Sequence, residues 1–289
     1  MAVQRREHHI VPQFYLRRFA DDQQRTWAID IATNTGSLIP VKRATTTSGF
    51  YLFDTKTGDE HEGWEALLGV IESGAARSIR RIVEQQQWPL PRQSRVNWAT
   101  WVAAQYLRTP KMRSYLDSSL DAWRESVDEG GPEAIRKSAS RPDLTDDEAA
   151  ALWKRADETI LRHQIQPNGA YMRAFGNLLR GAAQNLFERR WRLVRFAQPS
   201  LMTADEVVVP IGQEGEAFPL ITAADLVLVP LSRDVAVMAC EHDPKGQRPD
   251  DAVMQDEHQA GMLNRMVIDN AHATVFRHPA DHPLVAVTN

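Results

Sequence analysis

The stretch from Glu60 to Val83, EHEGWEALLGVIESGAARSIRRIV, decides the fold class, because its apolar residues recur every three or four positions. The apolar face consists of Trp64, Leu67, Leu68, Ile71, Ala75, Ile79 and Ile82. A repeat close to 3.6 residues is typical of an amphipathic helix that packs on a core. Two prolines in Trp88-Pro89-Leu90-Pro91 follow the pattern. The sequence therefore predicts a long helix over about 60–83.

The middle of the chain continues with helical patterns. They run over about 96–107, 115–123, 152–161 and 172–186. The first of them ends at Thr109-Pro110, where proline cannot extend a helix. Residues 128–147 are rich in glycine, proline, serine and acidic residues, so we predict a mobile excursion or hinge there.

Both ends of the chain have the pattern of strands. Residues 26–43 alternate around the turn Asn34-Thr35-Gly36 and predict a β-hairpin. Short runs rich in β-branched residues follow Arg190, with a helix around 256–271 and a strand at 274–276. We therefore predict one α+β domain over 1–289, with a mainly helical middle and with the C-terminal strands packed beside the N-terminal hairpin.

Composition excludes several classes of protein. Of the 289 residues, 43% are hydrophobic and 25% are charged, as in ordinary globular proteins and unlike disordered or coiled-coil chains. The net charge of −4 excludes a strongly basic nucleic-acid coat. Cys240 is the single cysteine, so neither an intramolecular disulfide nor a cysteine-rich zinc site is expected. No apolar run approaches 18 residues, so we expect a cytoplasmic protein without a membrane span.

Candidate functional residues begin with two adjacent histidines, His8 and His9, in HHIVPQFYLRRF. Adjacent side chains on an extended segment point to opposite faces, so one histidine can reach a site while the other packs. The alternative is a polar tail whose histidines have no role. We expect the pair to be held in place, because the apolar residues that follow are typical of a packed segment.

Two acidic residues are candidates as well. Glu72 lies at the edge of the apolar stripe of the 60–83 helix, where a carboxylate is either paired with a base or held in a site. Asp205 lies on a turn between two β-rich runs. An Asx-turn explains an aspartate at this place, but loops at strand ends also carry catalytic acids.

Arginines and a glutamine supply candidate substrate-binding groups. Gln105 and Arg108 share a helix face, and Arg113 follows the helix end at Pro110. Arginine at a helix junction can hold a carboxylate or phosphate through two hydrogen bonds. The alternative for Arg108 is a structural ion pair with Glu72 or Asp205. Arg17 belongs to a locally basic N-terminal region that either attracts phosphate or is a solvated helix face.

The opening motif His8-His9-x-Val-Pro-x-Phe-Tyr-Leu-x-x-Phe resembles the start of a bacterial family known as domain of unknown function 4238. Further landmarks are Phe50-Tyr51, Glu65, Ile71-Glu72, Gln105-Tyr106-Leu107-Arg108-Thr109-Pro110, Arg113, Thr203-Ala204-Asp205, Pro230-Leu231 and Leu263-Asn264. The resemblance covers nearly the whole chain. Ala204 stands where the family's turn has serine, and Glu206-Val207 replaces a stretch that ends in proline. The resemblance implies no activity.

The first functional hypothesis is a metal-assisted hydrolase or nuclease that acts on a phosphate-containing or nucleic-acid substrate. In this hypothesis His8, His9, Glu72 and Asp205 are catalytic. The substrate-binding residues are Gln105, Arg108, Arg113 and Arg17. His9, Glu72 and Asp205 would bind a divalent ion such as Zn, Mn, Mg or Fe, since nitrogen and oxygen ligands suit these metals. The expected partner is an anionic small molecule or a nucleic acid.

The second hypothesis is a non-enzymatic sensor or interaction module, for example in bacterial defence or stress response. The same histidine, glutamate, glutamine, arginine and aspartate side chains would then form a structural polar network. The chain contains no GxxxxGK[ST], HExxH, GxSxG or CxxC motif that would decide between the two hypotheses. Sequence also leaves the oligomeric state open.

Overall fold

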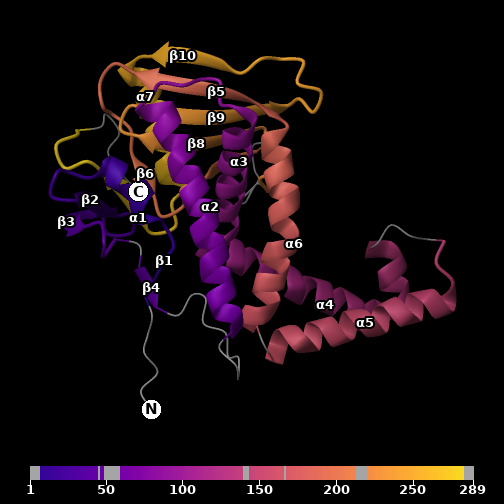
Figure 1. The fold of residues 1–289 in the computed structure, drawn as a ribbon. Helices are drawn as coiled ribbons and strands as arrows, with labels where there is room; N and C mark the ends of the chain where they lie inside the picture. The colour runs from indigo at the N-terminus through magenta and orange to yellow at the C-terminus, as the bar shows by residue number, and fades with distance from the viewer. Residues whose placement is uncertain are drawn as a thin grey trace. The chain divides into compact units, whose positions relative to one another are not determined.

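The computed structural model describes residues 7–44, 46–48, 59–138, 143–165, 167–212 and 220–282, and their helices and strands form an α+β fold (Figure 1). Contacts between residues divide the chain into two compact units. Unit 1 consists of 1–50, 63–109 and 178–289, and unit 2 of 51–62 and 110–177. The predicted fold class is confirmed. The prediction of one cooperative domain concerns unfolding and stays a prediction.

Unit 1 contains a five-stranded sheet in the order β10-β5-β9-β8-β7. These strands are β5 (Arg189–Phe196), β7 (Val209–Ile211), β8 (Leu226–Ser232), β9 (Val235–His242) and β10 (Asp251–Gln255). Neighbouring strands are antiparallel except β10, which runs parallel to β5 at the sheet edge. Sequence analysis did not predict β10, because its sequence DAVMQ does not alternate between apolar and polar residues.

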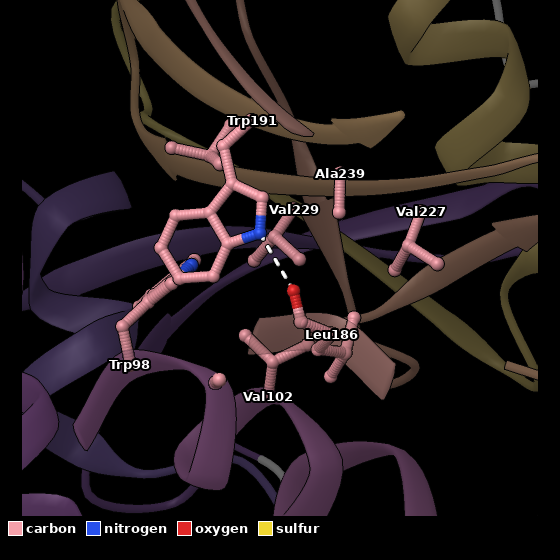
Figure 2. A pocket seen from close by; sticks show the side chains of 9 residues that line it. Trp98, Val102, Leu186, Trp191, Val227, Val229 and Ala239 are labelled. Atoms are coloured by element: carbon pink, nitrogen blue, oxygen red, sulfur yellow. Dashed lines mark hydrogen bonds between the residues drawn. The ribbon is translucent and has the colours of Figure 1, made fainter. Parts of the chain in front are cut away.

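Helices cover both faces of the central strands β8 and β9. Figure 2 shows Trp98 and Val102 of α3 (Arg92–Leu107) against Trp191 and Val229 of the sheet. The space between them admits about 10 Å³ of water-sized volume, so it holds at most one water molecule. Residues of the other face join a core with α7 (Glu257–Asn270), among them Leu228, Ala236, Ala260 and Leu263. Burial on both faces explains why these strands are continuously apolar.

A second sheet of unit 1 has the order β3-β2-β11-β6, with all neighbours antiparallel. Its strands are β2 (Arg25–Asp30), β3 (Thr35–Pro40), β6 (Thr203–Ala204) and β11 (Thr274–Arg277). The predicted hairpin is therefore present, and a C-terminal strand does lie beside it. Asn34 adopts a φ of 53° in the turn. A Cβ on Gly36 would lie 2.4 Å from the indole nitrogen of Trp27, so glycine is required there.

The helix that decided the fold class, α2, runs from Asp59 to Val83. Leu68, Ala75, Ile79 and Ile82 are buried as predicted, whereas Leu67 is 40% exposed and the prediction for it is wrong. Leu67 lies about 100° around the helix from Leu68, beyond the line that faces the core. Val96, the first residue of the helical pattern predicted over about 96–107, is likewise exposed.

The N-terminal segment is fixed by pairing and by burial. β1 (Glu7–His9) pairs antiparallel with β4 (Thr46–Ser48), which places the His9 backbone opposite Thr46. The short helix α1 (Gln13–Leu16) and the 3-10 turn η1 (Arg17–Phe19) follow. Tyr15, Leu16 and Phe19 are fully buried. The predicted anchoring of this segment on the core is confirmed.

The described residues of unit 2 lie mainly in helices. They are α4 (Pro110–Ser138), α5 (Asp146–Ile165) and the first part of α6 (Pro167–Phe187). Gly131 interrupts α4 with a φ of 55° before Pro132. Thr145 and Glu148 cap α5 reciprocally, because each backbone N–H bonds the other side chain at 2.9 and 3.3 Å. The described residues of 128–147 are thus largely helical with a break at Gly131, and the predicted mobility of this segment stays a prediction.

Among the described residues, no helix has the length and apolarity that crossing a membrane requires.

Candidate functional site

Helix α3 lies at the centre of the candidate site and is buried along nearly its whole C-terminal half, from Trp98 to Leu107. It meets α2 through the Ser78 hydroxyl, which lies 3.0 Å from the Ser94 carbonyl oxygen. It meets α1 through Phe14 and Tyr15, whose ring centroids lie 6.0 and 5.5 Å from that of Trp101. Polar side chains on this helix are therefore enclosed by protein.

Arg108 follows the last residue of α3 and is paired with Glu72 of α2. Its Nη1 donates a hydrogen bond of 2.8 Å to Oε1 of Glu72. The Arg108 side chain is only 2% exposed, whereas that of Glu72 is 29% exposed. A guanidinium at a helix C-terminus also interacts favourably with the helix dipole. Of the two ion-pair partners considered for Arg108, the structure selects Glu72.

The pair with Glu72 uses one side of the Arg108 guanidinium and leaves the other unpaired. Nε and Nη2 are buried and have no hydrogen-bond partner among the described residues. These two nitrogens form the edge of a guanidinium that binds carboxylate or phosphate through two parallel hydrogen bonds. Burying such donors without partners costs free energy, so they are an exception that requires explanation.

Two other buried donors on α3 share this property. Nε1 of Trp101 and Nε2 of Gln105 have no hydrogen-bond partner in the part of the chain that the structure describes. The indole of Trp191 is different, because its Nε1 donates to the Leu186 carbonyl at 2.8 Å (Figure 2). Positions 101, 105 and 108 follow the four- and three-residue spacing of one helix face. We call Trp101, Gln105 and Arg108 the α3 donor face.

Tyr15 connects the N-terminal segment to the strands near this face. Its hydroxyl donates to the Pro230 carbonyl at 2.8 Å and lies 2.7 Å from Oγ1 of Thr203, which donates to it. Burial raises the pKa of Tyr15. A neutral phenol with both hydrogen bonds satisfied is a structural anchor.

Asp205 lies directly after β6 and binds backbone amides. Oδ1 accepts from the N–H groups of Glu206 at 3.0 Å and His272 at 2.9 Å. Oδ2 accepts from Ala273 at 2.8 Å and Thr274 at 3.0 Å. Because a carboxylate has about four acceptor positions, these donors occupy all of them. The arrangement favours a structural role for Asp205 over the predicted catalytic and metal-binding roles.

The remaining predicted residues are His8, His9, Arg17 and Arg113. The side chains of His8 and His9 are outside the described part of the structure, so their predicted proximity to Glu72 or Arg108 stays a prediction. Arg17 is exposed and donates to the side-chain oxygens of Gln13 and Gln24, at 3.1 and 3.2 Å. Arg113 belongs to α4 of unit 2.

The described residues contain no cluster of three or more histidine, cysteine, aspartate or glutamate side chains that could hold a metal ion. The predicted set of His9, Glu72 and Asp205 includes a side chain outside that part, so metal binding stays a prediction.

Cys240 is partly buried, and burial raises the pKa of its thiol. His242 contacts Glu188, with 3.0 Å between Nε2 and Oε2.

Comparison with protein families agrees with the resemblance seen in the motifs. Residues 7–281 match the family described as "Protein of unknown function (DUF4238)". The chain belongs to this family. No curated protein and no solved structure matches the chain.

Within this DUF4238 chain, the sequence identified two members of the α3 donor face, Gln105 and Arg108, and missed Trp101. The signal for Trp101 was present, because it lies four residues before Gln105 and seven before Arg108. A tryptophan in a helix is ordinarily a core residue. Trp101 differs from the core residue Trp191 in that its N–H has no partner among the described residues.

Proposed function

We propose that this protein binds a phosphate-containing ligand at Arg108 and hydrolyses its phosphate ester with the help of Glu72. The observation that supports the proposal is the buried Nε/Nη2 edge of Arg108, which lacks a partner among the described residues. Two convergent donors on a cation match two oxygens of a phosphate group. Glu72 is partly exposed, so a solute can approach the pair from its side.

Charge balance suggests the role of Glu72. Arg108 and ionised Glu72 together are neutral, so an added phosphate group would bring uncompensated negative charge into a partly buried place. We assign Glu72 the role of proton donor, because it is the carboxyl group in direct contact with Arg108. In the proposed reaction, water adds to phosphorus, the bond to the ester oxygen breaks, and Glu72 gives that oxygen its proton. Glu72 then recovers a proton from the added water, which leaves phosphate and an alcohol.

A divalent metal would supply Lewis-acid chemistry in the proposal, with His9 as its protein ligand, because Glu72 serves as the proton donor. The position of the N-terminal segment supports a role for His9. Phe14 contacts Trp101 of the donor face, and the five residues from His9 to Phe14 span at most about 17 Å. Asp205 is left out of the proposed ligand set because four backbone amides already occupy its carboxylate.

The test combines binding and turnover. Thermal unfolding of the wild type is measured with and without inorganic phosphate, and hydrolysis of p-nitrophenyl phosphate is measured with Mg²⁺, Mn²⁺ or Zn²⁺. Arg108→Lys should lose most of the phosphate-induced stabilisation, because an ammonium lacks the planar two-donor edge. Glu72→Gln should keep phosphate binding and lose hydrolysis at least about a hundredfold.

Arg189→Lys is the matched control for Arg108→Lys. Arg189 is also buried, but its Nε, Nη1 and Nη2 donate to Asn185, Cys240 and Ile221 within the protein. This variant should be less stable than the wild type and still respond to phosphate. If phosphate does not stabilise the wild type, the proposed function is wrong.

The second candidate function is the sensor or interaction module with a structural polar network. One observation favours it, namely that the Asp205 carboxylate is fully engaged by the protein's own backbone. It predicts that Arg108→Lys and Arg189→Lys lower stability alike, with no effect of phosphate on either. The same set of measurements therefore separates the two candidates.

A further inference from the structure

The α3 donor face extends well beyond the reach of one phosphate group. Trp101 and Arg108 are seven residues apart, which corresponds to about 10 Å along the helix axis. Gln105 lies between them, about 4.5 Å from Arg108 along the axis. Inorganic phosphate bound to Arg108 would leave the N–H of Trp101 without an acceptor.

All the unpaired atoms of the α3 donor face are hydrogen-bond donors, so a matching ligand must supply acceptors. Nε1 of Trp101 and Nε2 of Gln105 are both uncharged hydrogen-bond donors. Each can be satisfied by a neutral acceptor atom of a ligand. Gln105 is 3% exposed and Arg108 2%, so bulk water does not reach these side chains. The matching ligand has an anion at one end and neutral acceptors toward the other.

The far end of the face is aromatic. The partly buried ring of Phe14 lies 6.0 Å from that of Trp101, with an interplanar angle of 55°. Trp101 is also in contact with Tyr15 and Trp98 at 5.5 and 5.1 Å, so its own position is fixed. A partly exposed aromatic ring beside an unpaired N–H is a suitable surface for a flat heterocycle that also accepts a hydrogen bond.

We infer that the phosphate-containing ligand is a nucleoside monophosphate that lies along α3. Its phosphate binds the Nε/Nη2 edge of Arg108, its ribose oxygens accept from Gln105, and its base contacts Phe14 and accepts from Trp101. The inference rests on the proposed function, because it requires the phosphate to bind at Arg108. Glu72 at the Arg108 end of the face and Phe14 at the Trp101 end are both partly exposed.

Three probes of increasing size test the inference by titration calorimetry of the full chain. They are inorganic phosphate, ribose 5-phosphate and adenosine 5′-monophosphate. The wild type should bind the nucleotide at least about tenfold more tightly than ribose 5-phosphate, and ribose 5-phosphate more tightly than phosphate, because each added group meets an unpaired donor.

Variants assign each step to a residue. Gln105→Leu should remove most of the advantage of ribose 5-phosphate over phosphate. Phe14→Leu and Trp101→Phe should each reduce the advantage of the nucleotide over ribose 5-phosphate by about threefold or more. Gln184→Leu is the matched control, since Gln184 is exposed and its amide donates to Glu188 at 2.9 Å. It should bind all three probes as the wild type does.

The possible failures are distinguishable. If phosphate binds and the three probes have equal affinity, the nucleotide inference is wrong and the proposed phosphate site stands. If ribose 5-phosphate binds as tightly as the nucleotide, recognition of the base is wrong. If none of the three binds, both the inference and the proposed function fail. Circular dichroism of each variant shows whether it is folded, and the Phe14→Leu variant keeps a test available if Trp101→Phe unfolds.

Discussion

Tyr15 and Thr203 are 188 residues apart in sequence, and their hydroxyl oxygens lie 2.7 Å apart in a fully buried contact. The same phenol donates to the carbonyl of Pro230 in β8. The N-terminal segment that carries the family's opening motif is thereby attached to both sheets of unit 1. This attachment holds Phe14 and Tyr15 against Trp101 of the donor face.

Tyr15→Phe should lower the free energy of unfolding by about 1–3 kcal/mol, because it leaves the Pro230 carbonyl and the Thr203 hydroxyl buried without this partner. Urea unfolding followed by tryptophan fluorescence measures the change. Thr203→Val in the same background gives a double-mutant cycle, and the two effects should add to more than the effect of the double variant. Additive effects would show that the contact does not contribute.

Stability at alkaline pH should depend on Tyr15. Its pKa is raised by burial, whereas a tyrosine in the unfolded chain titrates near pH 10. The contribution of the neutral phenol is therefore complete below about pH 10 and decreases above it, with a limiting slope of about 1.4 kcal/mol per pH unit. Unfolding free energies measured between pH 8 and 11 should decrease above about pH 10 in the wild type and decrease less in Tyr15→Phe. Equal slopes would contradict the prediction.

Removal of the Glu72 carboxylate should destabilise the protein by about 2 kcal/mol, because buried Arg108 would keep its charge without a counterion. Glu72→Ala is the test and Glu84→Ala is its control. Glu84 also pairs with an arginine, Arg18, at 2.9 Å, but its side chain is more than half exposed. An exposed pair contributes less than about 1 kcal/mol, so urea unfolding should rank the two variants clearly.

Asp205→Asn should weaken the hydrogen bonds that hold residues 272–274 at the start of β11. An asparagine keeps one acceptor oxygen and turns an N–H₂ group toward backbone donors, so we expect a loss of about 2–4 kcal/mol. Hydrogen exchange should become faster at the amides of His272, Ala273 and Thr274. Asp256→Ala, which removes a single helix-cap acceptor for Gln259, should cost about 1 kcal/mol and leave those amides unchanged. A folded Asp205→Asn variant with normal exchange and no hydrolysis would instead support a catalytic role.

Alkylation of Cys240 should be slow at neutral pH. Burial raises the pKa of the thiol, so the reactive thiolate forms only at higher pH than in an exposed cysteine. The rate of reaction with iodoacetamide should still increase between pH 8.5 and 9.5 in the native protein. The urea-unfolded protein is the control and should react faster throughout. A fast native reaction at pH 7 would indicate activation by a neighbour such as His242.

Much of the fold could be predicted because secondary structure depends on the spacing of nearby residues. The 3.6-residue pattern predicted α2 within one residue at its N-terminus, and the turn at Asn34 predicted the hairpin. Edge strand β10 has little periodicity and was missed for that reason. Leu67 was misplaced because the sequence contains more apolar positions than the core face of α2 can bury.

The sequence by itself determined the fold class, the family and the polar positions that needed partners. Only the tertiary structure decided which partner each one received. Arg108 could pair with Glu72 or Asp205 from sequence, and packing of α3 on α2 brings Glu72 to 2.8 Å while Asp205 binds amides of residues 272–274. Local propensity acts over a few residues, whereas a hydrogen bond needs two groups within about 3 Å in space. The unpaired edge of Arg108 therefore becomes visible only when the chain is folded.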